Sequence, residues 1–106
     1  MRVLFDQGTP VPLRQLLPAD EVATVYKRGW SALKNGELLD AAEADGFNVL
    51  VTTDRNLKYQ QNLSSRRLAI VALSSTSWPR IRAAAELVVS AVGVASAGDY
   101  SEVLIP

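Results

Sequence analysis

The chain has 106 residues, of which 48% are hydrophobic and 21% charged, and its 11 basic and 11 acidic residues leave no net charge. This composition is ordinary for one globular domain with a single core. Cysteine and histidine do not occur, which excludes disulfides, thiolate or imidazole metal sites and histidine-based catalytic triads. Hydrolytic chemistry would therefore have to come from carboxylates, lysine, tyrosine or hydroxyl groups.

The first half of the chain predicts alternating strands and helices. A short apolar strand ends at Asp6, and a segment with helical spacing follows at residues 12–17. A stretch rich in β-branched residues at 21–26 predicts a second strand. Residues 35–44 then predict a helix, with Asn35 as its N-terminal cap.

The second half continues the alternation. Residues 48–54 predict the clearest strand, and the continuous apolar run at 68–73 is typical of a strand buried on both faces. A helix is expected at 77–95 and a last short strand at 100–105. We therefore expect residues 1–106 to form one three-layer α/β/α domain with a mainly parallel sheet of four to five strands.

The expected topology brings two carboxylates together. The first β-α-β unit, with its right-handed crossover, places the second strand beside the first, and if the chain then crosses to the other flank, the third strand lies on the free side of the first. Such a reversal is the point where open α/β sheets build their sites. Asp6 and Asp54 end the first and third strands. Each alone fits a turn or a helix cap, but as close neighbours they would repel each other unless a cation or proton intervened.

Glu37 is the third acidic candidate. It falls in the first turn of the helix at 35–44, at the edge of the sheet where Asp6 is expected, although the helix dipole also favours an acid there. Asp40 and Glu43 are expected to face solvent. Three carboxylates without imidazole suit Mg²⁺ or Mn²⁺, and such an ion activates water and neutralises charge on a phosphodiester.

Three segments resemble the small PIN-like family of bacterial proteins, namely residues 4–6 with Pro10, residues 35–39 and residues 51–57. These proteins are compact relatives of PIN-domain ribonucleases, which include many toxins of toxin–antitoxin modules. The resemblance covers residues 2–73 and implies that Asp6, Glu37 and Asp54 occupy the catalytic, metal-binding positions.

The chain departs from the pattern of that family at two points. PIN nucleases usually carry a fourth acid, and many related segments read Thr-x-Asp-x-Asp-Phe. This chain has Asn56 and Leu57 at the last two of those positions. The departure implies a weaker metal site or a lost activity.

A basic segment follows Asp54, with six bases and no acid between Arg55 and Ala85. Basic side chains hold phosphates, amides read base edges and tyrosine stacks on bases. The residues expected to contact RNA are Arg55, Asn56, Lys58, Tyr59, Arg66 and Arg67. Trp30 and Lys34 are candidates for a stacking or partner contact, with core filling an equal expectation for Trp30.

These observations predict a cytoplasmic, metal-dependent endoribonuclease with RNA as its partner, and with no membrane span. The resemblance implies a toxin with a cognate antitoxin protein. The apolar helix at 81–89 would allow a homodimer, although packing within the domain explains its composition equally well. One alternative is a non-catalytic binding or assembly module. Another is a phosphoacceptor receiver domain with Asp54 as acceptor, although only one acid follows the first strand and no lysine ends the last.

Overall fold

Five parallel strands form the middle layer of the structure, a computed structural model that describes residues 1–60 and 62–106, with the backbone alone at residues 59 and 60. The strands follow the order β2-β1-β3-β4-β5 across the sheet. Their bounds are β1 Arg2–Phe5, β2 Glu21–Thr24, β3 Val49–Thr52, β4 Ala69–Leu73 and β5 Tyr100–Val103. The helical elements are the 3-10 helix η1 (Val11–Leu16), α1 (Asn35–Ala44), α2 (Leu57–Gln60), α3 (Trp78–Ala83) and α4 (Ala85–Val94).

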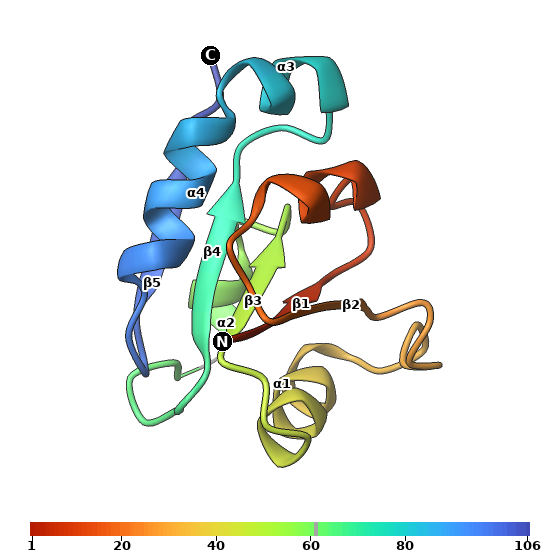
Figure 1. The fold of residues 1–106 in the computed structure, drawn as a ribbon. Helices are drawn as coiled ribbons and strands as arrows, with labels where there is room; N and C mark the ends of the chain where they lie inside the picture. Colours follow the sequence, from red (N-terminus) through yellow and green to blue (C-terminus); the bar gives the residue numbers. More distant parts are fainter. Residues whose placement is uncertain (61) are drawn as a thin grey trace.

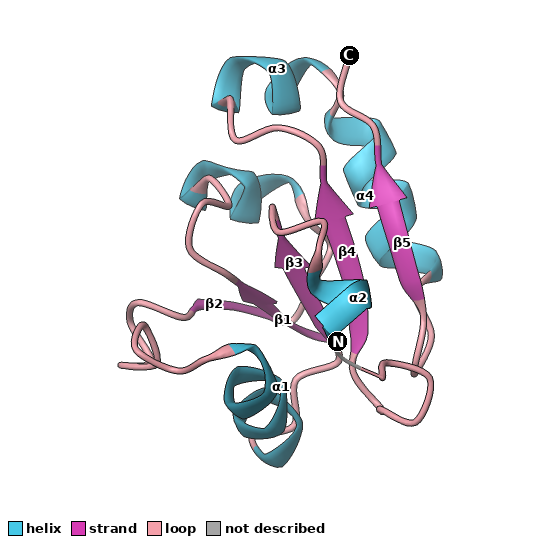
Figure 2. Ribbon diagram, turned by 180° about the vertical axis from the view of Figure 1, so that it is seen from behind, coloured by secondary structure: helices cyan, strands magenta, loops and turns pink. Residues whose placement is uncertain are grey.

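Helices cover both faces of the sheet, so the expected three-layer α/β fold is confirmed (Figure 1). Successive residues of a strand point to opposite faces. Leu50 and Ile70 accordingly pack with α1 and α2, whereas Val51 and Val71 pack with η1, α3 and α4. Figure 2 shows α2 in front of the sheet and α4 behind it. Every residue of β3 and β4 is buried, which explains their continuous apolar sequences.

The order in which strands are added across the sheet reverses at β1. This strand pairs with β2 on one side and with β3 on the other, with Phe5 level with both Thr24 and Val51. The carboxyl ends of β1 and β3 are therefore neighbours at the same edge of the sheet. This is the arrangement that the crossover argument predicts.

Two helical segments differ from the sequence-based expectation. The segment after β1 is a 3-10 helix of six residues, about two turns, with Pro12 in its first turn and Pro18 shortly after its end. The expected helix at 77–95 is two helices that meet at Ala84, where φ is −110° and ψ is 22°. The Ala84 N–H donates to the carbonyls of both Arg80 and Ile81, as in the tightened last turn of a helix.

The beginning of α1 is shifted by one residue from the expectation. Lys34 is its N-terminal cap, with extended backbone angles, and Asn35 is already helical. In the part of the chain that the structure describes, every helix is too short or too polar to cross a bilayer.

Candidate functional site

A buried hydroxyl connects the two acidic strand ends. Thr52, the last residue of β3, has 0% exposure. Its Oγ1 donates to Oδ2 of Asp6 at 3.0 Å and accepts from the backbone N–H of Asp54 at 3.0 Å. The Asp6 N–H also donates to the carbonyl of Val51 at 3.0 Å, which extends the pairing of β1 with β3 by one residue. Asp6 and Asp54 thus lie around one hydroxyl at the carboxyl edge of adjacent strands.

Each of these carboxylates also stabilises its own loop. Oδ1 of Asp6 accepts from the Gln7 N–H at 2.8 Å, and Oδ1 of Asp54 accepts from the Asn56 N–H at 2.9 Å, just before α2. These are the turn and capping contacts that either residue could make alone. No hydrogen bond from a described residue reaches Oδ2 of Asp54, and both side chains are partly exposed. The Asp54 carboxylate therefore keeps one oxygen for a ligand.

The two carboxylates open onto different hollows of the surface. Asp6 lies at the end of a groove of about 630 Å³ that runs along β2. Asp54 lines a second hollow of about 470 Å³ together with Arg55, Asn56 and Glu102. Thr52, which is hydrogen-bonded to both residues, lines neither hollow, so a ligand shared by the two aspartates would have to reach from one hollow to the other.

Glu102 is a site residue that sequence reasoning missed. Parallel register places it level with Ala72 and Thr52, at the same edge of the sheet as Asp54. Its Oε1 lies 2.9 Å from Nζ of Lys58, whose hydrogen bond lowers the pKa of the Glu102 carboxyl below its ordinary value. The sequence shows an acid within the expected strand at 100–105, but its position level with Thr52 depends on the register of β5 against β4, which the sequence does not define.

Tyr100 lies next to this hollow, where its hydroxyl contacts two of the residues around it, Arg55 and Glu102. Its hydroxyl oxygen lies 3.2 Å from Oε1 of Glu102 and 3.3 Å from the carbonyl of Arg55, and it can donate to either. Burial raises the pKa of Tyr100 to about 12, with the negative charges of Glu102 and Asp54 acting in the same direction. The phenol therefore stays protonated and serves as a hydrogen-bond donor at neutral pH.

Glu37 lies in the first turn of α1, as its position in the sequence predicts. Its Oε1 accepts from the Lys34 N–H at 3.2 Å, so the carboxylate satisfies a backbone donor that the helix leaves unpaired. Across residues 1–60 and 62–106 there is no group of three acidic side chains placed to hold one metal ion. Asp6, Glu37 and Asp54 therefore do not form a three-carboxylate cage in this structure.

Within the basic segment, the Arg66 side chain forms ion pairs with two acids of α1. Its guanidinium contacts Oδ1 of Asp40 at 2.8 Å and Oε1 of Glu43 at 2.6 Å, and the Arg67 N–H donates to Oε2 of Glu43 at 2.9 Å. The expectation that Glu43 faces solvent is wrong, since its side chain is 14% exposed. Desolvation opposes its ionisation, but the hydrogen bonds from Arg67 and Arg66 prevail and lower the pKa of Glu43.

The other members of the basic segment are more accessible. Arg55 and Asn56 are exposed beside Asp54, and the Arg67 side chain is 82% exposed. Lys58 lies in the same hollow, where it pairs with Glu102. The side chain of Tyr59 lies outside the described part of the chain.

Trp30 packs against the core under α1. Its ring meets the Phe47 ring edge-to-face at 6.2 Å, and the Arg28 guanidinium lies 5.1 Å from the centre of the indole. These contacts support core filling for Trp30. Lys34, which caps α1, has an exposed side chain.

Comparison of the chain with family models, with curated proteins and with solved structures finds no match. The function of the chain is therefore inferred from its residues and their geometry.

Proposed function

We propose that this chain is a PIN-like endoribonuclease that hydrolyses RNA phosphodiesters with the help of Mg²⁺ or Mn²⁺. The observation that carries the proposal is the placement of Asp6 and Asp54 around the Thr52 hydroxyl. This hydroxyl lies at the carboxyl edge of the sheet, where the strand order reverses. Ligands of open α/β sheets bind at such points, beyond the carboxyl ends of the strands.

The donor set suits a hydrated Mg²⁺ ion. Mg²⁺ in phosphoryl-transfer sites is bound by one or two carboxylates, and water and substrate phosphates complete its coordination. Asp6 and Asp54 supply two carboxylates, and oxygen donors are the kind that Mg²⁺ and Mn²⁺ prefer. Glu37 is the candidate third acid, and it would have to give up its bond from the Lys34 N–H to reach a shared ion. When bound, the ion would supply Lewis-acid stabilisation of the negative charge on the phosphodiester.

The protein's own residues would place the RNA. The guanidinium of Arg55 is exposed next to Asp54 and has no ion-pair partner among the residues described, so it is available for a phosphate. The exposed amide of Asn56 can hydrogen-bond to a base edge. Thr52 fixes the Asp6 carboxylate, and the Asp54 loop is fixed by its bond to the Asn56 N–H. Arg67, at 82% exposure, extends the basic surface.

Three features favour a second candidate function, a non-catalytic PIN-like module that binds RNA or a partner without cleaving it. Asn56 stands where related segments carry an acid, and the described residues include no three-acid metal group. Lys58 also pairs with Glu102, the other acid that lines the hollow of Asp54. The basic surface would serve this module equally well.

A cleavage assay separates the two functions. Purified protein is incubated with fluorescently labelled single-stranded RNA and MnCl₂, MgCl₂ or EDTA, and binding is followed in parallel by anisotropy. A nuclease cleaves RNA only with the metal, and Asp6→Asn and Asp54→Asn each reduce the rate by about a hundredfold or more. Glu86→Gln, an exposed change in the first turn of α4, is the matched control. RNA that is bound but stays intact with both metals contradicts the nuclease and supports the module.

The resemblance to PIN-like proteins extends the proposal to the setting of this activity. We propose a cytoplasmic toxin whose cognate antitoxin protein blocks it. The proposal predicts that expression of the chain alone slows bacterial growth, and that Asp6→Asn relieves this effect at equal protein level. Equal growth with the wild-type chain and with the variant would contradict it.

A further inference from the structure

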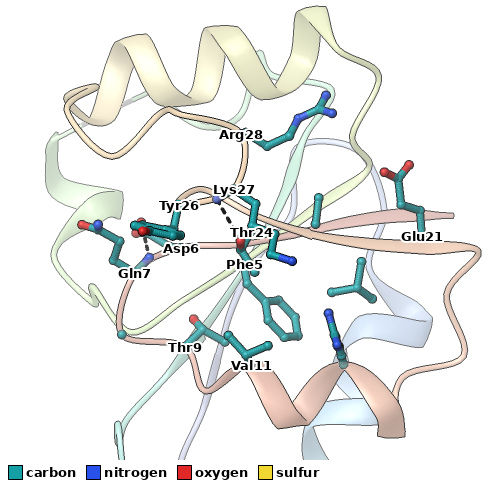
Figure 3. Close-up of a pocket in the computed structure, with 14 residues that line it drawn as sticks. Phe5, Asp6, Gln7, Thr9, Val11, Glu21, Thr24, Tyr26, Lys27 and Arg28 are labelled. Atoms are coloured by element: carbon teal, nitrogen blue, oxygen red, sulfur yellow. Dashed lines mark hydrogen bonds between the residues drawn. The ribbon is translucent and has the colours of Figure 1, made fainter.

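A groove runs along β2, the outermost strand of the sheet on the side of β1. We call it the β2 groove, and it lies between η1 and the turn at residues 26–28. Figure 3 shows Asp6 and Gln7 at one end of it and Glu21 at the other. Its volume of about 630 Å³ is large enough for several residues of an extended peptide.

The backbone of β2 turns hydrogen-bonding groups into this groove. The Val25 N–H donates to the carbonyl of Phe5 in β1. Alternate residues of a parallel strand bond the same neighbour, so Val22 and Thr24 direct their backbone groups to the open side. The Thr24 carbonyl accepts from the Arg28 N–H. Among the residues described, nothing outside the sheet pairs with the Val22 N–H and C=O or with the Thr24 N–H.

Of the charges that line the groove, Arg14 and Lys27 remain against the single acid Asp6, which lies at one end, so the walls carry a small excess of positive charge. Glu21 pairs with Arg2 and Arg28 pairs with Asp45, and both partners lie outside the groove. Arg14 and Lys27 line the groove and have no ion pair with any described residue. They stand on the two sides of β2, one on η1 and the other in the turn after the strand.

Apolar side chains accompany these two bases. Val11 is 45% exposed and Tyr26 is 76% exposed, and both line the groove. An edge strand that is neither covered nor paired is a template for another chain. Main-chain bonds then give the affinity, and alternate side chains of the added strand give the specificity.

We propose that the β2 groove binds an extended acidic peptide segment of a partner protein, which adds as a sixth strand beside β2. Its backbone meets the free groups of Val22 and Thr24, its acidic side chains pair with Arg14 and Lys27, and its apolar side chains contact Val11 and Tyr26. Because the groove ends at Asp6, the bound segment covers this carboxylate. The binding itself goes beyond the proposed nuclease activity and does not depend on it.

The test uses a synthetic probe of about eight residues, a usual strand length. Glutamate alternates with valine in the peptide, and both ends are capped. One control peptide has lysine in place of glutamate, and a second carries N-methyl groups on alternate residues, which removes donors from one edge. Affinity is measured by titration calorimetry, and backbone amide exchange of the full chain is followed by NMR.

The proposal predicts that the acidic peptide slows exchange of the Val22 and Thr24 amides. The lysine peptide and the N-methylated peptide are expected to bind at least about tenfold more weakly. Arg14→Glu and Lys27→Glu, tested separately, each weaken binding of the acidic peptide by a few-fold, and together by about tenfold or more. Arg82→Glu, an exposed change on α3, leaves it unchanged.

Several results would overturn the proposal. These are no binding of the acidic peptide, binding without protection of the two amides, and equal binding of the N-methylated peptide. Protection of the same amides by single-stranded RNA would assign the groove to RNA instead. A concentration-dependent dimer, with these amides protected in the free protein, would assign the groove to a second copy of this chain. None of these readouts requires RNA cleavage, so failure here is distinct from failure of the nuclease proposal.

Discussion

The Thr52 hydroxyl donates to the Asp6 carboxylate across 3.0 Å from a position with 0% solvent exposure. The same oxygen accepts from the Asp54 N–H. The buried Thr52 hydroxyl therefore holds Asp6 by its carboxylate and Asp54 by its backbone N–H. Valine, with nearly the same shape, would pack here as well but could do neither.

Thr52→Val is accordingly expected to destabilise the fold by about 1–3 kcal/mol, because the Asp54 N–H loses its acceptor in a partly buried place. Urea unfolding measures this change. Thr76→Val, at an exposed position, is the control and should change the free energy of unfolding by less than about 0.5 kcal/mol. Equal effects of the two substitutions would show that the Thr52 bonds contribute nothing.

Glu43 gives a prediction about acid stability. Its carboxylate accepts from Arg66 and from the Arg67 N–H, and Glu43→Gln should cost about 1–2 kcal/mol at neutral pH. The pKa of Glu43 is lowered from its ordinary value of 4.5, so the stabilisation is present above that value. It is lost as the pH falls through the lower, folded-state pKa.

Urea unfolding of the wild type and of Glu43→Gln over a series of pH values checks this. The difference in unfolding free energy should be constant near neutral pH and should shrink below about pH 4.5. Glu86→Gln serves as a control without a recorded ion pair among the described residues. A difference that stays constant into strong acid would contradict the assignment.

The contribution of Tyr100 to the stability of the fold is expected to be lost at high pH, whereas that of Glu43 is lost at low pH. The folded-state Tyr100 pKa of about 12 lies above the ordinary value of 10.0, so its contribution to stability is complete below pH 10.0 and is lost as the pH rises toward 12. Ultraviolet titration should show a phase of tyrosine ionisation near pH 12, and Tyr100→Phe should abolish this phase. Three tyrosines that ionise together with ordinary values would contradict the buried contact with Glu102.

Glu37→Gln tests whether the third acid is a metal ligand or a helix cap. The side-chain carbonyl of glutamine can still accept from the Lys34 N–H, so α1 is expected to keep its stability. Mn²⁺ affinity, measured by titration calorimetry, should fall less than in Asp6→Asn, because the described geometry engages Glu37 at its own helix. A loss as large as that in Asp6→Asn would place Glu37 on the ion.

The order of the first three strands could be predicted in part, because right-handed crossovers limit the possible topologies but do not decide the flank on which the third strand is added. Continuous apolar sequences predict β3 and β4, and strands buried on both faces need that composition. The 3-10 form of η1 and the break at Ala84 depend on the local competition between hydrogen-bond patterns, to which apolar spacing is insensitive.

Only part of the site could be predicted, because contacts between distant segments cannot be derived from the local sequence pattern. Asp6 and Asp54 stand at strand ends, where topology alone determines their position. Helical spacing predicts a solvent-facing Glu43, because it does not show that Arg66, 23 residues away, folds back onto this carboxylate. Glu102 required the register of β5 against β4, which a sequence without an alignment does not define.

The most direct test of the central claim, that Asp6 and Asp54 share one ion, is a crystal structure of the protein soaked in MnCl₂, with anomalous data. We expect an anomalous peak within coordination distance of both carboxylates, close to Thr52, and we expect Asp6→Asn to remove it. A peak between Asp54 and Glu102 with none at Asp6, or no peak in this region at saturating Mn²⁺, would contradict the claim.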